Sequence, residues 1–253
     1  MSTPVAQSDQ RLRVSVVLPV MNETEALRET VRQLAAGCAD CLCEIVIVVA
    51  RGTTVASRAT IATITELVSC PVRVFEQRLP GLGGALREGF DQVSGEWVVM
   101  MASDLETDPS IVPLMIARMR QGDCDIVTAS RWAYGGGFEG YGPIKLILNQ
   151  LFQVVVGRMY GVRLTDLTYG FRLFRTAIVQ TIRWEEHGHP MLLETLVKPL
   201  RLGYRVVEIP APWRKRTEGT SSNNALYNIR YLRPALKNRV RPRHELLRTT
   251  SNS

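Results

Sequence analysis

The chain has 253 residues, of which 45% are hydrophobic and 22% are charged, a composition that fits one large globular domain or a domain with an appendage. No apolar run approaches the roughly 18 to 20 residues that span a bilayer, and residues 1–10 lack the apolar core of a signal peptide, so we expect a cytoplasmic protein. The net charge of +7 points to anionic partners, and without a zinc-finger, helix-turn-helix or RNA-recognition signature we expect no nucleic acid among them.

Apolar strand-like runs alternate with helix-period segments through the first half of the chain. Strands are predicted at 14–19, 44–50, 72–76, 97–101 and 125–129. Helices are predicted between them at 23–36, 57–68, 84–93 and 110–121. This alternation predicts an α/β fold with a doubly wound, mostly parallel sheet. In such sheets ligands bind outside the carboxyl ends of the strands.

Two groups of metal-ligating residue types are better explained without a metal. Cys38, Cys41 and Cys43 have no fourth ligand of suitable spacing, and we expect reduced thiols at a helix-to-strand junction. His187 and His189 stand in a segment bounded by glycine and proline, which favours a plain loop over a second metal site.

The segment Val98–Pro109 is the most informative, because an apolar run stops there at closely spaced carboxylates. Asp104 and Glu106 are two residues apart, so in extended backbone both side chains leave the same face. Mg²⁺ and Mn²⁺ favour one or two carboxylates with water and phosphate as further ligands, so the pair is a candidate metal site. The alternative is a capped turn or a solvated acidic loop. Asp108 with Pro109 predicts a helix start.

Other polar signals stand at the ends of predicted strands. Asn22 and Glu23 follow the first strand, and Ser130 and Arg131 follow the fifth. The glycine-rich segment Pro80–Gly89 follows the third strand and enters a helix, where backbone N–H groups can face a phosphate. A plain turn explains this glycine segment equally well, because it does not follow the first strand as a dinucleotide fingerprint does.

Together these segments resemble glycosyltransferase family 2, and within it the polyprenol-phosphate (dolichol-phosphate) hexosyltransferases of GT-A fold, over roughly residues 14–222. Val16–Glu23 resembles the opening strand and the Pro-x-x-Asn-Glu motif beside the nucleotide. Pro80–Gly89 resembles the Gly-x-Gly-x-Ala segment, and Met101–Glu106 takes the place of the Asp-x-Asp metal motif. Three later segments resemble motifs around the donor and acceptor phosphates: Ser130-Arg131, Asp166–Arg172 and Arg216–Ser221.

The resemblance implies an inverting transfer of a hexose from a nucleotide-sugar donor to a polyprenyl-phosphate lipid, with Mg²⁺ or Mn²⁺ as cofactor. It implies that Asp104 and Glu106 hold the metal. The implied donor-binding residues are Pro19, Met21, Asn22, Glu23, Gly81, Gly83 and Ser103. Those implied to grip an acceptor phosphate are Arg131, Arg172 and Arg216. For a hydroxyl acceptor, which needs a base, the candidates are Asp166 and Glu194. A turn cap for Asp166, a helix-face ion pair for Glu194 and surface ion pairs for the arginines are the structural alternatives.

Two departures from the family pattern leave alternatives open. Ala50-Arg51-Gly52-Thr53 stands where the family has Asp-Asp-Gly-Ser, and Ala102 stands at the first aspartate of Asp-x-Asp. The nucleobase of the nucleotide-sugar donor is therefore undetermined. A family 2 enzyme acting on a glycan or small-molecule hydroxyl, and a noncatalytic nucleotide-sugar-binding protein, are the other hypotheses.

The resemblance also divides the chain into a GT-A domain over 1–222 and a basic helical extension with a tail over 223–253. From Arg214 to Arg248 there are ten basic and two acidic residues. Residues 143–161 mix apolar residues with Lys145, Asn149, Gln150, Gln153 and Arg158, which predicts an amphipathic helix that can lie at a bilayer surface but is too polar to cross it. We expect this helix and the basic segment to touch the inner face of a membrane peripherally.

Overall fold

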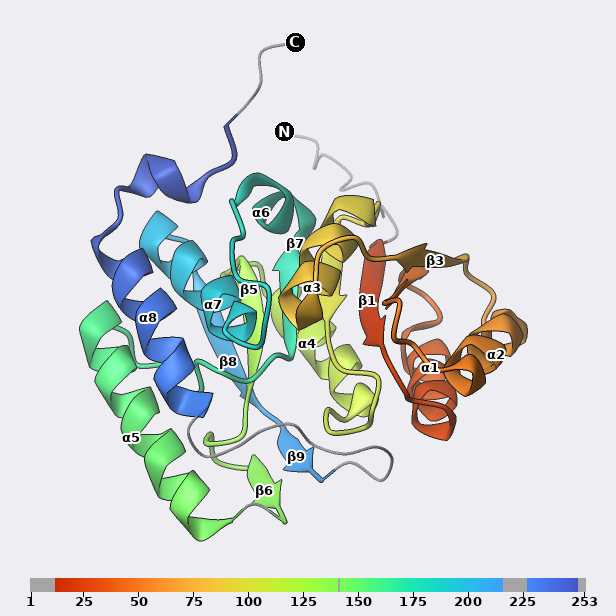
Figure 1. Ribbon diagram of the computed structural model, residues 1–253, viewed down its shortest axis with the longest axis horizontal. Helices are drawn as coiled ribbons and strands as arrows, with labels where there is room; N and C mark the ends of the chain where they lie inside the picture. Colours follow the sequence, from red (N-terminus) through yellow and green to blue (C-terminus); the bar gives the residue numbers. More distant parts are fainter. Residues whose placement is uncertain (1–11, 141, 216–226, 250–253) are drawn as a thin grey trace, which may run out of the picture.

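The structure, a computed structural model, describes residues 12–140, 142–215 and 227–249. Its strands are β1 (Val14–Val20), β2 (Leu42–Val49), β3 (Val72–Glu76), β4 (Trp97–Met100), β5 (Ile126–Ser130), β6 (Gly137–Glu139), β7 (Arg172–Arg175), β8 (Val206–Pro210) and β9 (Pro212–Arg214). Its α-helices are α1 (Glu25–Cys38), α2 (Val55–Ile64), α3 (Gly81–Gln92), α4 (Val112–Met119), α5 (Pro143–Tyr160), α6 (Thr176–Thr181), α7 (Met191–Leu202) and α8 (Tyr227–Val240) (Figure 1). Short 3-10 turns cover Thr65–Leu67, Pro109–Ile111 and Arg243–Leu246.

The main sheet has the strand order β3-β2-β1-β4-β7-β5-β8. Strand β7 runs antiparallel to both β4 and β5, whereas the other neighbours are parallel. The predicted α/β class with a mostly parallel sheet is confirmed, and each of the five predicted strands agrees with the structure to within two residues. Strands β6 and β9 form a separate parallel pair near the carboxyl ends of the main strands (Figure 1).

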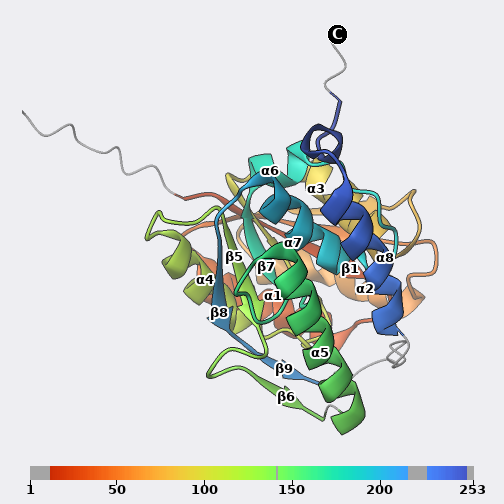
Figure 2. The ribbon, with the colours of Figure 1, turned by 90° about the vertical axis from the view of Figure 1, so that its left-hand side faces the viewer.

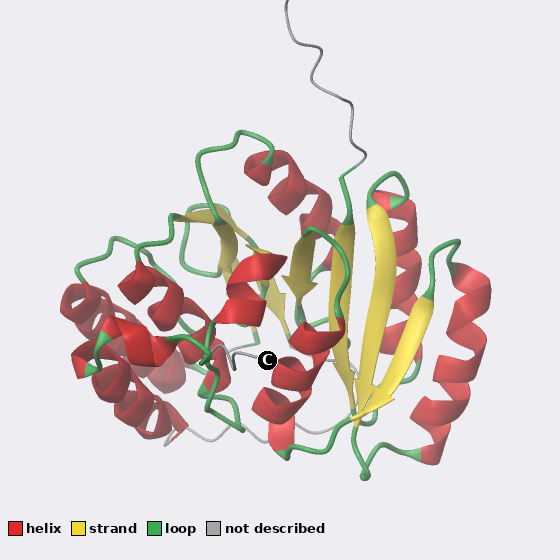
Figure 3. Cartoon of the chain, turned by 90° about the horizontal axis from the view of Figure 1, so that it is seen from above, coloured by secondary structure: helices red, strands yellow, loops and turns green. Residues whose placement is uncertain are grey.

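Helices cover both faces of the main sheet (Figure 3). Along β1, Val14, Val16 and Leu18 pack on one side with apolar residues of α1, α2 and α4. Val17 points to the other side, where α3 and α6 supply the packing. Successive side chains of a strand point to opposite faces, so a strand covered by helices on both sides is apolar at successive positions.

A third apolar cluster joins α5, α7 and α8 outside the sheet. The predicted helix over 143–161 is present as α5, with Pro143 at its first position and Gly161 ending it at φ 67°. Figures 1 and 2 show α5 and α8 side by side at one edge of the molecule. Within the described residues, no helix combines the length and apolarity needed to cross a membrane.

Candidate functional site

Three segments meet at the carboxyl ends of β1, β2 and β4. The Ser103 hydroxyl donates to the carbonyl of Pro19 at 2.8 Å, which holds the loop after β4 against the end of β1. The N–H of Thr54 donates to the carbonyl of Met21 at 2.9 Å, which brings the loop after β2 to the same place. Met21 and Asn22 are exposed at this junction. The structure therefore gathers the predicted donor residues of β1 and β4 at one edge of the sheet.

Glu23 supports this junction from inside. Its side chain is 8% exposed, and its carboxylate accepts from the N–H groups of Met21 at 2.7 Å and Asn22 at 3.1 Å. These bonds fix the turn between β1 and α1. Glu23 thus holds Met21 and Asn22 in position through its buried carboxylate.

The acidic loop after β4 is a tight turn. Leu105, between the two carboxylates, has φ 61°, a left-handed value that is strained for a leucine. The N–H of Glu106 donates to Oδ1 of Asp104 at 3.0 Å, which closes the turn. The premise that extended backbone places Asp104 and Glu106 on one face is therefore wrong. Asp104 is 5% exposed at the loop's inner side.

The segment around β9 covers the same loop. Nε1 of Trp213 donates to Oε2 of Glu106 at 3.3 Å, and the Tyr169 hydroxyl donates to the backbone carbonyl of Glu106 at 3.2 Å. Burial raises the pKa of Tyr169 above its ordinary value of 10, so the hydroxyl stays protonated and remains a donor. Glu106 is thus held in place by two residues from distant parts of the chain.

Arg131 and Asp166 form a buried ion pair at the carboxyl end of β5. Nε and Nη2 of Arg131 donate to the two carboxylate oxygens of Asp166 at 2.7 and 2.9 Å, a bidentate geometry. The side chains are 9% and 0% exposed. The guanidinium also lies over the rings of Tyr169 and Phe138, at 4.8 and 5.1 Å from their centres. The orientation of Arg131 is therefore fixed from several sides.

Residues that the sequence analysis missed hold Asp166. Nε2 of Gln153, on α5, donates to Oδ1 of Asp166 at 3.4 Å and to the Thr168 hydroxyl at 2.8 Å. Glu208, in the middle of β8, accepts from the N–H of Asp166 at 2.8 Å, and burial raises the pKa of Glu208. A lone glutamate in an otherwise apolar strand is the signal that would have identified Glu208.

Two of the polar residues of α5 lie on its buried side. Asn149 and Gln153 are 5% and 4% exposed and face inward. Oδ1 of Asn149 accepts from Nε1 of Trp132 at 3.2 Å and from Nε2 of Gln153 at 3.0 Å. The inner side of α5 is polar here because the buried Asp166 needs hydrogen-bond donors.

Arg172 does not reach the site surface. The side chain is fully buried and donates to the hydroxyls of Thr128 and Thr195 at 3.0 and 2.6 Å, and to the carbonyl of Leu167 at 3.0 Å. Burial lowers the pKa of Arg172 to about 10, which still leaves it charged at neutral pH. The prediction that Arg172 grips an acceptor phosphate is not supported by this position. The N–H groups of its guanidinium are used in hydrogen bonds that connect β7 with β5 and α7.

Glu194 is also internal. It is 1% exposed, and its carboxylate pairs with Nζ of Lys198 at 2.6 Å, one helical turn later on α7. It also accepts from the N–H groups of Glu185 and Glu186 at 3.1 and 2.9 Å. The arrangement matches the ion-pair alternative, and Glu194 anchors the loop before α7 instead of facing an acceptor as a base.

The glycine-rich segment packs against that same loop. The N–H groups of Gly83 and Gly84 donate to the carbonyl of His187 at 2.7 and 3.4 Å. A Cβ at Gly81 or Gly83 would stand closer than 3.0 Å to a backbone carbonyl of the loop. Close backbone approach therefore explains these glycines, and the prediction that this segment leaves its N–H groups open to phosphate is wrong for Gly83 and Gly84.

A hollow of about 500 Å³ opens beside the acidic loop. Leu105 and Asp108 line it on one side, and Arg214 and Lys215 line it on the other. Lys215 is exposed, whereas Arg214 forms a loose surface pair with Glu139 at 3.6 Å. Two carboxylates, Asp108 and Glu139, line the hollow together with these two cations, so its charges balance. Arg216, the next residue and a predicted acceptor contact, lies outside the described residues.

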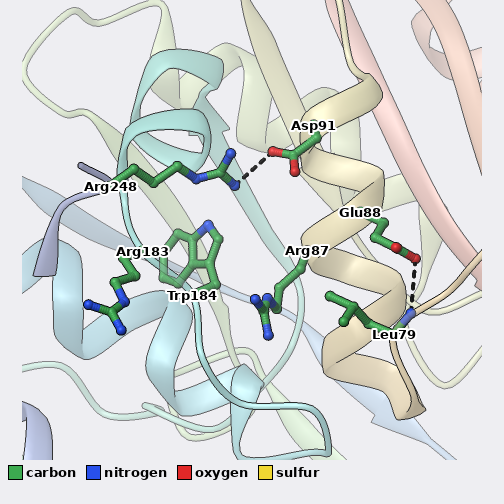
Figure 4. Close-up of a pocket in the computed structure, with 7 residues that line it drawn as sticks. All are labelled: Leu79, Arg87, Glu88, Asp91, Arg183, Trp184 and Arg248. Carbon is green, nitrogen blue, oxygen red and sulfur yellow. Dashed lines mark hydrogen bonds and ion pairs between the residues drawn. The ribbon is translucent and has the colours of Figure 1, made fainter. Parts of the chain in front are cut away.

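A smaller hollow of about 280 Å³ lies between α3 and the C-terminal segment (Figure 4). Arg248 pairs there with Asp91 at 2.7 Å, and Glu88 accepts from the N–H of Leu79 at 3.4 Å. Trp184 is 2% exposed and belongs to the core. The described residues that line this hollow include none of the predicted donor, acceptor or metal residues, so it is separate from the candidate site.

Comparison with known proteins identifies the family to which a chain with this geometry belongs. The model of the family described as glycosyl transferase family 2 matches residues 15–183, which include β1, the acidic loop and the Arg131–Asp166 pair. The chain belongs to glycosyltransferase family 2. The family resemblance predicted from the motifs is thereby confirmed.

Two relatives of this family 2 chain are named for polyprenol-phosphate substrates. It is 30% identical over 227 residues to a dolichol-phosphate mannosyltransferase of Pyrococcus furiosus, covering 88% of this chain and 62% of the relative. It is 26% identical over 213 residues to an undecaprenyl-phosphate 4-deoxy-4-formamido-L-arabinose transferase of Pseudomonas fluorescens, covering 82% and 59%. The chain thus spans about three fifths of the length of these relatives.

A solved structure confirms the predicted GT-A fold. Glucosyl-3-phosphoglycerate synthase from Mycobacterium tuberculosis, crystallised with Mn²⁺, UDP-glucose and phosphoglyceric acid, superposes on this family 2 chain with a TM-score of 0.72. The match covers 91% of this chain and 81% of that chain at 17% identity, so it shows the fold alone.

The metal-ligating side chains of this family 2 chain suit a hard divalent cation that is held partly by substrate. Within the described residues, no group of three or more His, Cys, Asp and Glu is placed to bind a metal. Asp104 and Glu106 supply carboxylate oxygens, while Ala102 supplies none. Mg²⁺ and Mn²⁺ are commonly bound by one or two carboxylates together with phosphates and water, so these residues fit such an ion.

Proposed function

We propose that this chain transfers a hexose from a nucleoside diphosphate sugar to a polyprenyl phosphate. The observation that carries the proposal is that both candidate bases are engaged in buried ion pairs. Asp166 is engaged by Arg131, and Glu194 is engaged by Lys198. A hydroxyl acceptor needs a base, whereas a phosphate acceptor is already ionised at neutral pH. The structure therefore favours a phosphate acceptor, in keeping with the names of the two relatives.

In the proposed reaction an oxygen of the acceptor phosphate attacks the anomeric carbon of the donor sugar and forms the new C–O bond. The bond to the nucleoside diphosphate breaks, and its electron pair leaves on the diphosphate with inversion at the anomeric carbon. Met21, Asn22, Pro19 and Ser103 would bind the donor at the ends of β1 and β4. Arg131, oriented by Asp166, would hold the acceptor phosphate. Arg216, which lies outside the described residues, would be a second contact to that phosphate.

Asp104 and Glu106 would hold the divalent metal, Mg²⁺ or Mn²⁺. When bound, the ion would neutralise charge on the leaving diphosphate. Lys215, exposed beside the acidic loop, would add one further positive charge near the diphosphate.

A polyprenyl phosphate resides in a membrane, so the proposed reaction takes place at a membrane surface. We place the chain in the cytoplasm, in peripheral contact with the inner face of that membrane. The division into a GT-A domain over 1–222 and a basic extension over 223–253 remains part of this proposal, with α8 packed on α5 and α7.

Thermal stabilisation tests the donor and the metal together. The protein is heated with UDP, GDP, CMP and dTDP species, each with Mn²⁺, Mg²⁺ or EDTA. A ligand at 100 times its Kd contributes about 2.7 kcal/mol, which corresponds to roughly 5 to 10 °C in a chain of this size. We expect a metal-dependent shift with one nucleotide, and Asp104→Asn should remove it. Asp40→Asn, an exposed control at the opposite end of the sheet, should retain it.

Transfer to a short-chain polyprenyl phosphate in detergent tests the reaction. Asp104→Asn should lower kcat at least about 100-fold, and unchanged turnover would remove the metal assignment. Arg131→Lys keeps the charge but loses the bidentate fork, so it should raise the KM for the acceptor and not for the donor. Normal acceptor affinity in both Arg131→Lys and Arg131→Ala would contradict the phosphate role. No nucleotide shift and no transfer with any donor would favour a noncatalytic protein.

A further inference from the structure

The large apolar side chains that the structure leaves exposed are concentrated on two helices. Among the described residues, nine of them form what we call the α5–α8 face: Ile144, Ile147, Leu148, Leu151, Val154, Val155, Leu232, Leu236 and Val240. Their exposed fractions range from 39% at Leu232 to 80% at Val240. The two helices lie side by side (Figures 1 and 2). Large exposed apolar side chains gathered on two neighbouring helices indicate an interaction site.

The spacing on α5 shows that this exposure follows the helical period. The outward residues recur at intervals of three and four from Ile144 to Val155. The inward residues do the same and include Phe152 and Val156, which pack on α7 and α8. The inner side already covers the core and supports Asp166 through Gln153. Among the residues that the structure describes, none covers the apolar residues on the outer side of α5.

Charge identifies what fits this face. Helices α5 and α8 contain no aspartate or glutamate. Their basic residues are Lys145, Arg158, Arg230, Arg233, Lys237 and Arg239, of which Lys237 pairs with Glu185 and Arg239 donates to the carbonyl of Met159. Apolar side chains combined with basic and without acidic residues are what an anionic lipid surface recognises, since the apolar groups enter the acyl boundary and the cations meet the phosphates.

The same charges disfavour a second copy of this chain as the occupant. A two-fold symmetric contact places the same patch on both subunits, so it would bring basic residues of both α5–α8 faces together with no carboxylates from these helices between them. Like charges at such a contact repel. A bilayer with anionic headgroups satisfies the apolar and the charged residues together.

We propose that the α5–α8 face docks this protein on an anionic bilayer surface. The inference rests on the proposed function only in taking the acceptor to be a membrane lipid. A helix is about 10 Å in diameter, so docking on the outer side of α5 puts its inner side about that far from the headgroups. Gln153 on that inner side contacts Asp166, the partner of Arg131. A phosphate at the membrane surface is then within reach of the candidate acceptor residues.

Vesicle binding tests the docking face. The full chain is sedimented with vesicles of phosphatidylcholine alone and with about 30% phosphatidylglycerol, at low and high salt. Ile147→Asp combined with Leu151→Asp should weaken binding to anionic vesicles at least about tenfold. Val55→Asp combined with Leu114→Asp changes exposed apolar residues on α2 and α4, and it should bind like the wild type. Circular dichroism and melting temperature establish that both variants are folded.

The outcomes are distinct. Equal binding by the two double variants, or binding that ignores anionic lipid and salt, would overturn the proposal. So would a dimer in solution that Ile147→Asp with Leu151→Asp dissociates, because a second copy would then cover the face. In the transfer assay this variant should keep activity on a water-soluble short-chain acceptor and lose it on a vesicle-embedded one. Lipid binding without transfer to any acceptor would refute the proposed function and leave the docking face standing.

Discussion

Glu185 offers a quantitative test of how the outer helices are attached. Its carboxylate lies 3.2 Å from Nζ of Lys198 on α7 and 3.3 Å from Nζ of Lys237 on α8, and it also pairs with Arg241 just after α8. The side chain is 18% exposed. Burial by itself would raise the pKa of Glu185, but Lys198 and Lys237 outweigh it and lower the pKa to about 2.

The magnitude follows from linkage. A carboxylate whose pKa falls from its ordinary 4.5 to about 2 on folding contributes about 3 kcal/mol, since one pKa unit is about 1.4 kcal/mol. Because folding lowers the pKa of Glu185, its ionised form stabilises the folded state. This contribution to the free energy of unfolding is complete above about pH 5 and is lost as the pH falls toward 2. At pH 3.5, one unit below the ordinary pKa, about 1.4 kcal/mol of it is gone.

Urea unfolding at several pH values between 7 and 3.5 checks this prediction for Glu185→Gln. We expect the variant to be about 2 to 3 kcal/mol less stable at pH 7, and the difference from the wild type to shrink by about 1.4 kcal/mol at pH 3.5. Glu25→Gln removes an exposed carboxylate paired with Arg28 at 3.5 Å, and it should cost less than about 1 kcal/mol at either pH. A difference between wild type and Glu185→Gln that stays constant across this pH range would refute the reasoning.

Three further substitutions probe the interior. Arg172→Met should cost at least about 3 kcal/mol in urea unfolding, because it leaves buried hydroxyls and carbonyls without their donor; a loss below 1 kcal/mol would contradict the role described above. Gly83→Ala should lower the melting temperature by several degrees, because its Cβ would clash with a carbonyl of the facing loop, whereas Gly137→Ala, with open space, should not. Gln153→Leu should cost about 1 to 3 kcal/mol, and Gln150→Leu, exposed on the same helix, should be nearly neutral; equal effects would place the network elsewhere.

The strands were predictable where apolar runs are continuous and buried on both faces. β1, β2 and β5 carry such runs, and the structure places them as expected. Strand β7 was missed because its four residues, Arg172–Arg175, begin and end with arginine and give no strand pattern. Its insertion between β4 and β5 depends on pairing with residues far away in the chain, which local pattern does not encode.

The sequence predicted that the site lies at the carboxyl ends of the strands. It did not predict the roles of the individual side chains there. Arg131 and Arg172 both stand in family motifs, yet Arg131 lies at the sheet edge and Arg172 is fully buried. The difference is set by what packs above each residue, and α7 covers Arg172 through Thr195. Gln153 did not stand out in the sequence as a site residue, because polar residues on a helix usually face solvent. A buried carboxylate reverses that rule, since an unpaired charge in the interior costs more than burying an amide.

The two outer helices support different halves of the candidate site. From α5, Gln153 contacts Asp166, which orients Arg131 on the acceptor side. From α8, Lys237 holds Glu185, and two residues farther along the chain the carbonyl of His187 accepts from the glycine segment. Each half is therefore braced by a helix of the α5–α8 face through a short chain of direct contacts. A surface that docks on a lipid bilayer would then fix the height of both halves above the membrane together, which a lipid-bound phosphate acceptor and a soluble donor require.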